Sequence, residues 1–123
     1  MNFASIGAFS LAVAVTLGAF GAHGLKNHLD EYLMGVWEKA VLYHFIHALG
    51  LLIVGLAARS GGLNQSTANR AGWLLLAGMI LFSGSLYTLA LTRLTVLGAV
   101  TPLGGLAFIA AWLWLGVGLL RSN

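Results

Sequence analysis

The sequence predicts an all-α integral membrane protein: a four-helix bundle with an amphipathic interfacial helix between its first and second membrane spans. The first reason is composition, since the 123 residues are 59% hydrophobic and only 7% charged, with a mean hydropathy of +0.93. A soluble domain carries about 25% charged residues, because its surface faces water. The second reason is that four uncharged runs each reach the roughly 20 apolar residues needed to cross a hydrocarbon core about 30 Å thick.

The composition also bounds the domain organisation and the chemistry. With one Pro and no long polar stretch, we expect a single membrane domain over residues 1–123. The six basic and three acidic residues are scattered, without the Lys/Arg cluster that is typical of nucleic-acid binding. The absence of Cys excludes disulfides, thiolate metal sites and iron–sulfur clusters. Membrane lipid is therefore the expected surrounding, and we expect no nucleic-acid partner.

The first predicted span covers about residues 3–22. Near its end, the segment AFGA resembles the small-residue cleavage site of a signal peptide, which is the alternative interpretation. No Lys or Arg precedes the apolar run, however, and the run is longer than the roughly 7–15 residues typical of a signal peptide. We therefore expect this segment to remain as a membrane span.

The predicted interfacial helix covers about residues 24–39. Apolar residues recur there at helical spacing, namely Leu25, Leu29, Tyr32, Leu33, Val36 and Trp37. Tyr and Trp favour the headgroup level, so the helix is expected to lie in the outer interface. A helix packed across the mouth of the bundle would have the same periodicity.

The remaining spans are expected at about residues 40–58, 71–92 and 97–120, and none of the four spans contains Asp, Glu, Lys or Arg. A polar connection over residues 60–70 joins the second span to the third. Four spans place both termini on one face. The basic residues divide evenly between the faces, but Asp30, Glu31 and Glu38 dilute the positive charge opposite the termini. This favours termini in the cytoplasm.

Small residues are expected to pack the helices, because lipid tails give apolar helices no hydrophobic reason to associate. Ala14, Gly18 and Ala22 follow one another at four-residue spacing in the first span, and Ala107 and Ala111 do so in the fourth. Such ridges allow close contact within one chain or between copies. A homo-oligomer is therefore expected.

Polar side chains are concentrated in the half of the spans that lies nearer the outer face. In the stretch LYHFIHALG, His44 and His47 lie three residues apart, so both can face one neighbouring helix. With the second span starting near residue 40, His47 would lie roughly 10 Å below the helix start. The expected polar cluster consists of His23, Tyr43, His44, His47, Ser83, Ser85, Tyr87 and Thr101.

Three interpretations of this cluster remain open. The first is structural: neutral His side chains hydrogen-bond to Ser, Tyr or backbone carbonyl groups and so join the helices. The second is a haem or transition-metal site, with His23 and His47 as candidate ligands. The third is a pathway for a proton or solute. Since no carboxylate lies at the same depth, the structural interpretation is favoured, with no catalytic residue, no metal and no cofactor.

Four segments in order, GAFGAHGL, YHFIHALG, FSGSLYTLAL and VTPLGG, resemble the YgdD-like family of small membrane proteins. These are bacterial inner-membrane proteins of unknown function with four expected spans. The resemblance implies a structural or accessory role linked to membrane integrity, not an enzyme, in a multi-pass bacterial inner (plasma) membrane protein. It also implies that His23 and His47 are the better pair of histidines. The expected helix-packing residues are Gly18 from the first ridge and Gly21, Gly84, Pro102, Gly104 and Gly105 from the family pattern.

Overall fold

The computed structural model describes residues 2–121, and all the regular structure in this range is helical. The elements are α1 (Phe3–His23), α2 (Glu31–Arg59), α3 (Gln65–Gly78), the π-helical segment η1 (Met79–Gly84), α4 (Ser85–Thr92), the 3-10 helix η2 (Thr95–Ala99) and α5 (Thr101–Arg121). Four stretches are long and apolar enough to cross a membrane: Phe3–His23, Glu31–Arg59, Gln65–Thr92 and Thr95–Arg121. This confirms the four-helix membrane bundle, and each predicted span lies inside one of these stretches.

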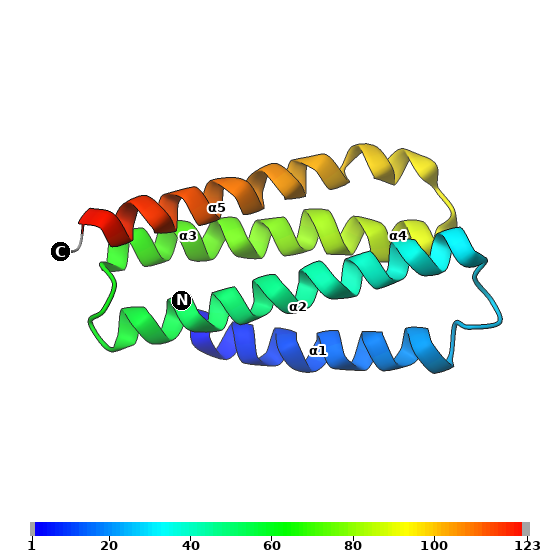
Figure 1. Cartoon of the computed structure of the whole chain (residues 1–123), viewed down its shortest axis with the longest axis horizontal. Helices are drawn as coiled ribbons and strands as arrows, with labels where there is room; N and C mark the ends of the chain where they lie inside the picture. Colours follow the sequence, from blue (N-terminus) through cyan, green and yellow to red (C-terminus); the bar gives the residue numbers. More distant parts are fainter. Residues whose placement is uncertain (1, 122–123) are drawn as a thin grey trace.

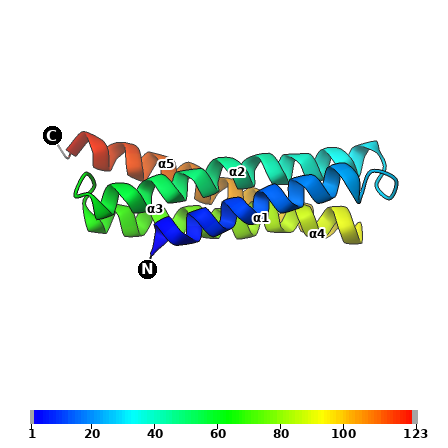
Figure 2. The same cartoon turned by 90° about the horizontal axis from the view of Figure 1, so that it is seen from below.

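The helices alternate in direction and lie side by side in the order α1, α2, α3 with α4, and α5 (Figure 1). α1 packs chiefly against α2, and α5 packs chiefly against α3 and η1. The start of α1, the end of α5 and the connection between α2 and α3 lie at one end of the bundle, which we call the terminal end (Figure 1, Figure 2). The connections from α1 to α2 and from α4 to α5 lie at the opposite end.

The separate interfacial helix predicted over residues 24–39 is wrong. Residues 24–30 form turns, and α2 runs without interruption from Glu31 to Arg59. Asp30 begins this helix, because its side chain accepts a hydrogen bond from the backbone N–H of Leu33 at 2.8 Å. Leu33 and Trp37 are buried, and Trp37 donates its indole N–H to the carbonyl of Leu17 in α1 at 3.0 Å. The apolar periodicity therefore marks a face of α2 that packs into the bundle.

Glycines set the closest helix contacts. A Cβ atom at Gly104 would collide with the backbone of Phe82, and one at Gly21 would collide with the indole of Trp37. The other residues expected to pack helices are less confined: a Cβ atom at Gly18, Gly84 or Gly105 would meet its nearest neighbour at 3.4–4.0 Å, and Pro102 is exposed. Gly21 and Gly104 are therefore the tight positions in that set.

The closest approach between α1 and α2 uses two glycines that the sequence patterns do not single out. A Cβ atom at Gly7 would collide with the backbone of Leu52, and one at Gly55 would collide with the backbone of Ala4. In the predicted ridge, Ala14 is fully buried while Ala22 is exposed. Contact between the two backbones fixes how far along α2 the first helix sits, and so decides which polar groups of the two helices meet.

Candidate functional site: a hydrogen-bonded chain through the bundle

His44 links three helices near the middle of the bundle. Its Nε2 lies 2.8 Å from the hydroxyl of Ser10 on α1, and its Nδ1 lies 2.9 Å from the hydroxyl of Tyr87 on α4. Ser10 in turn lies 3.8 Å from the sulfur of Met79 in η1. The imidazole is 8% exposed, so these neighbours replace water around the ring. We call Tyr87, His44 and Ser10 the His44 chain.

A neutral imidazole matches both hydroxyl groups of the His44 chain. One ring nitrogen carries a proton and donates, while the other accepts. If Tyr87 donates to Nδ1, the Nε2 proton is donated to Ser10, and the Ser10 hydroxyl is free to donate to Met79. The reverse tautomer donates to Tyr87 and accepts from Ser10. In either case each hydroxyl has a partner, which matters because an unpaired polar group in hydrocarbon costs several kcal/mol.

His47 has a different role from His44. Its Nδ1 lies 2.7 Å from the backbone carbonyl of Tyr43, one turn earlier in the same helix. A carbonyl oxygen only accepts, so the proton is on Nδ1. The ring stacks on Phe108 of α5, with 3.4 Å between centroids and 10° between planes, and lies 5.7 Å from the ring of Trp112. His47 therefore serves as a flat packing surface between α2 and α5.

Two serines tie neighbouring elements together. Ser83, in η1, donates its hydroxyl to the carbonyl of Ala40 in α2 at 2.8 Å. Ser85, at the start of α4, lies 2.6 Å from the hydroxyl of Thr101 at the start of α5. π-helical turns inside α-helices occur often at functional positions, and here the π segment carries the serine that bonds to α2. These bonds hold the third spanning stretch against both of its neighbours.

The predicted polar cluster divides into separate groups. His44 joins Tyr87, Ser85 joins Thr101, His47 and Ser83 bond to backbone carbonyls, and Tyr43 packs its ring 4.4 Å from that of Phe82. His23 is exposed at the end of α1. Gly21 lies against Trp37, and His47 is ten residues further along α2, or about 15 Å. The structure therefore does not bring His23 and His47 together as a pair of metal ligands.

The two histidines lie farther from the start of their helix than expected. Because α2 begins at Glu31, nine residues before the expected start at Ala40, His44 and His47 lie about 20 Å and about 24 Å from the helix start rather than about 10 Å for His47. His44 is thus near the middle of a 29-residue helix. The sequence patterns also missed Ser10, since a single serine in an apolar span has no local signal.

The interior polar groups are satisfied by one another. Within residues 2–121, every fully buried side-chain nitrogen or oxygen has a hydrogen-bond partner. In the same part of the chain, His, Asp and Glu side chains do not gather in groups of three or more around a point where a metal ion could sit. These hydrogen bonds join helices, and Nε2 of His47 is the one ring nitrogen of His44 and His47 that they leave unbonded.

Four apolar spanning helices with an internally bonded polar centre define a small multi-pass membrane protein. A family model described as "Protein of unknown function (DUF423)" matches residues 17–105, and the chain belongs to this family. A UPF0382 membrane protein of Staphylococcus haemolyticus is 52% identical over 113 residues, which cover 92% of this chain and 90% of that protein. The UPF0382 membrane protein YwdK of Bacillus subtilis is 49% identical over 116 residues, covering 94% and 93%.

No solved structure matches the chain. The family and its relatives confirm the expected class, a small membrane protein family of unknown function. The narrower YgdD-like name stays a prediction.

Proposed function

We propose that the chain is a non-catalytic structural or accessory protein of the bacterial inner (plasma) membrane. The observation that carries this proposal is that both ring nitrogens of His44 are hydrogen-bonded within the His44 chain, one to Ser10 and the other to Tyr87. A general acid, base or nucleophile needs a donor or acceptor that can reach a substrate. A histidine whose two nitrogens are both engaged inside the bundle is better suited to holding helices together.

We further propose that the protein works without a metal or cofactor and that it associates with itself. The separation of His23 from His47 along the bundle argues against a shared metal or haem between them. Self-association is supported by small residues that α1 presents outward at four-residue spacing, Ala8 and Ala12, which would allow a helix of a second copy to approach closely. Mass measurement of the protein in lipid nanodiscs tests this: a monomer alone at all protein-to-lipid ratios would contradict it.

The proposed orientation has both termini in the cytoplasm. The three acidic residues of the sequence, Asp30, Glu31 and Glu38, belong to the start of α2, opposite the terminal end. Arg59 and Arg121 end their helices at the terminal end, without nearby acidic residues in the sequence. This distribution favours a cytoplasmic terminal end.

A complementation experiment tests the structural role. A deletion strain is scored for membrane permeability, membrane potential and survival of envelope stress, and then complemented with wild type, His44→Ala or Tyr87→Phe. We expect each variant to restore the phenotype in proportion to the amount of folded protein in the membrane. A variant that folds and accumulates like wild type but does not complement would instead indicate a chemical role. A deletion with no phenotype would also count against the proposal.

A further inference from the structure

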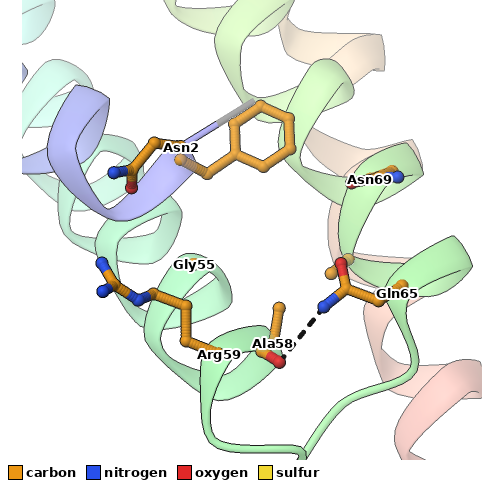
Figure 3. Close-up of a pocket in the computed structure, with 8 residues that line it drawn as sticks. Asn2, Gly55, Ala58, Arg59, Gln65 and Asn69 are labelled. Atoms are coloured by element: carbon orange, nitrogen blue, oxygen red, sulfur yellow. Dashed lines mark hydrogen bonds between the residues drawn. The ribbon is translucent and has the colours of Figure 1, made fainter.

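A pocket of about 340 Å³ opens at the terminal end of the bundle, between the start of α1, the last turns of α2 and the start of α3 (Figure 3). Its polar lining consists of Asn2, Arg59, Gln65 and Asn69, and Phe3 and Ala68 contribute apolar surface. Asn2 and Arg59 lie on one side of the pocket, and Gln65 and Asn69 lie on the other. This pocket is separate from the His44 chain and does not depend on its proposed role.

On the side of the pocket formed by Asn2 and Arg59, the free groups are donors. The Asn2 side-chain oxygen accepts the backbone N–H of Ser5 at 3.1 Å, which leaves the Asn2 amino group for another partner. Across the pocket, the amino group of Gln65 donates to the carbonyl of Ala58 at 3.3 Å, and the side-chain oxygens of Gln65 and Asn69 are acceptors on that side. The guanidinium of Arg59 has no hydrogen-bond or ion-pair partner among residues 2–121. A guanidinium and an amide N–H₂ on the same side of a pocket form a donor pair for an anion.

The surrounding charge favours an anion as well. All three acidic side chains of the sequence belong to residues 30–38, at the opposite end of the bundle, so no Asp or Glu competes for Arg59. Planar guanidinium groups bind phosphate oxygens through two parallel hydrogen bonds. With the bundle spanning a bilayer, its terminal end would meet the headgroup region. The apolar wall of the pocket at Phe3 and Ala68 suits the glycerol and first methylene groups of a lipid.

We propose that this pocket binds a phosphate group, with Arg59 supplying the charge and Asn2 a second donor. The phosphate belongs either to the headgroup of an anionic phospholipid or to a soluble phosphate ion. Three variants test the assignment. Arg59→Gln removes the charge. Asn2→Asp keeps an oxygen at the helix N-cap, so α1 keeps its cap, but places a negative charge beside the anion. Arg121→Gln is the matched control, because it removes an arginine from the same end of the bundle outside the pocket.

Native mass spectrometry of the detergent-purified protein, titrated with phosphatidylglycerol or phosphatidylcholine, measures binding of a lipid headgroup. We expect wild type and Arg121→Gln to bind phosphatidylglycerol preferentially, and Arg59→Gln and Asn2→Asp to bind it about tenfold more weakly. Thermal unfolding with inorganic phosphate and no added lipid measures binding of the soluble phosphate ion. A rise in the melting temperature of wild type that Arg59→Gln lacks would assign the soluble source.

Two results would overturn the proposal. One is that Arg59→Gln and Asn2→Asp bind both phosphatidylglycerol and inorganic phosphate as wild type does. The other is that Arg121→Gln weakens binding as much as Arg59→Gln. This would mean that anion binding depends on the overall charge of the surface and not on the pocket. Melting temperatures of all three variants without ligand show that each is folded before its binding is compared.

Discussion

His44 and His47 are three residues apart on one helix, yet their surroundings assign them different roles. His44 bonds to side chains of two other helices, whereas His47 bonds within its own helix and stacks on Phe108. The sequence places both rings in one span, but it does not show what faces them. That depends on the depth at which α1 meets α2, which is set by backbone contacts at Gly7 and Gly55. The bonding of His44 to Ser10 and Tyr87 therefore required the three-dimensional structure.

The energy of the His44 chain can be measured with a double-mutant cycle on His44→Ala and Tyr87→Phe. Interhelical hydrogen bonds in membranes contribute about 0.6 kcal/mol on average and up to about 1.7 kcal/mol. We expect a coupling free energy in the upper part of this range, because both partners are held in the bundle. Thermal or denaturant unfolding in one detergent gives the free energies of unfolding of wild type, the two single variants and the double variant. Additive losses, with no coupling, would mean that the 2.9 Å contact does not stabilise the fold.

Adjacent glycines on α5 provide a second test at the residue scale. Gly104→Ala would place a Cβ atom against the backbone of Phe82, whereas Gly105→Ala would meet only a ring carbon at 3.9 Å. Alanine favours a helix over glycine by up to about 1 kcal/mol at either position. We therefore expect Gly105→Ala to be neutral or stabilising and Gly104→Ala to lower the melting temperature clearly. Equal melting temperatures for the two variants would contradict the close contact between α5 and η1.

At the scale of elements, the four spanning helices followed from composition and run length, because hydrocarbon demands such runs. The residue at which α2 starts could not be predicted in this way. The periodicity of residues 25–37 shows only that one face of a helix is apolar, and a membrane surface and a neighbouring helix are equally good explanations of that face. Contacts of Trp37 with Leu17 and with the ring of Tyr87, at 4.7 Å between centroids, decide between them. The first turns of α2 therefore pack against the other helices of the bundle.

Substitution of the aromatic residues in this part of α2 tests that packing. Trp37→Ala removes a side chain that is 2% exposed and bonded to α1, so we expect a loss of about 3 kcal/mol or more in the free energy of unfolding. Tyr32→Ala removes an aromatic side chain that is 68% exposed, and we expect a change within about 0.5 kcal/mol. Similar small effects for both variants, together with weaker membrane attachment, would favour a surface helix instead.

At the scale of the whole molecule, the two ends of the bundle differ in charge. The terminal end has arginines and no Asp or Glu in the sequence, while the opposite end combines basic residues with all three acidic ones. The count of basic residues alone cannot orient the protein, because it divides evenly between the faces. The acidic residues, together with the placement of the connections, provide the basis for the proposed orientation.

The orientation can be measured directly, because the native chain has no Cys and each introduced thiol is unique. Ser60→Cys marks the connection at the terminal end, and Asn27→Cys marks the turn between α1 and α2; both positions are exposed. With a membrane-impermeant maleimide applied to intact cells, we expect Asn27→Cys to be labelled and Ser60→Cys to be protected until the cells are opened. The reverse pattern would place the termini outside.

The π-helical segment Met79–Gly84 has a consequence for how the chain can change in length. A π turn arises when one extra residue is inserted into an α-helix. The helical segments before and after the turn keep the directions in which their side chains point. Removing Ile80, which is exposed, would let the segment return to a regular helix without rotating Tyr87 away from His44. The same deletion within α3 would turn every later side chain by about 100°. Single-residue deletions should therefore be tolerated at residues 79–84 and not within α3.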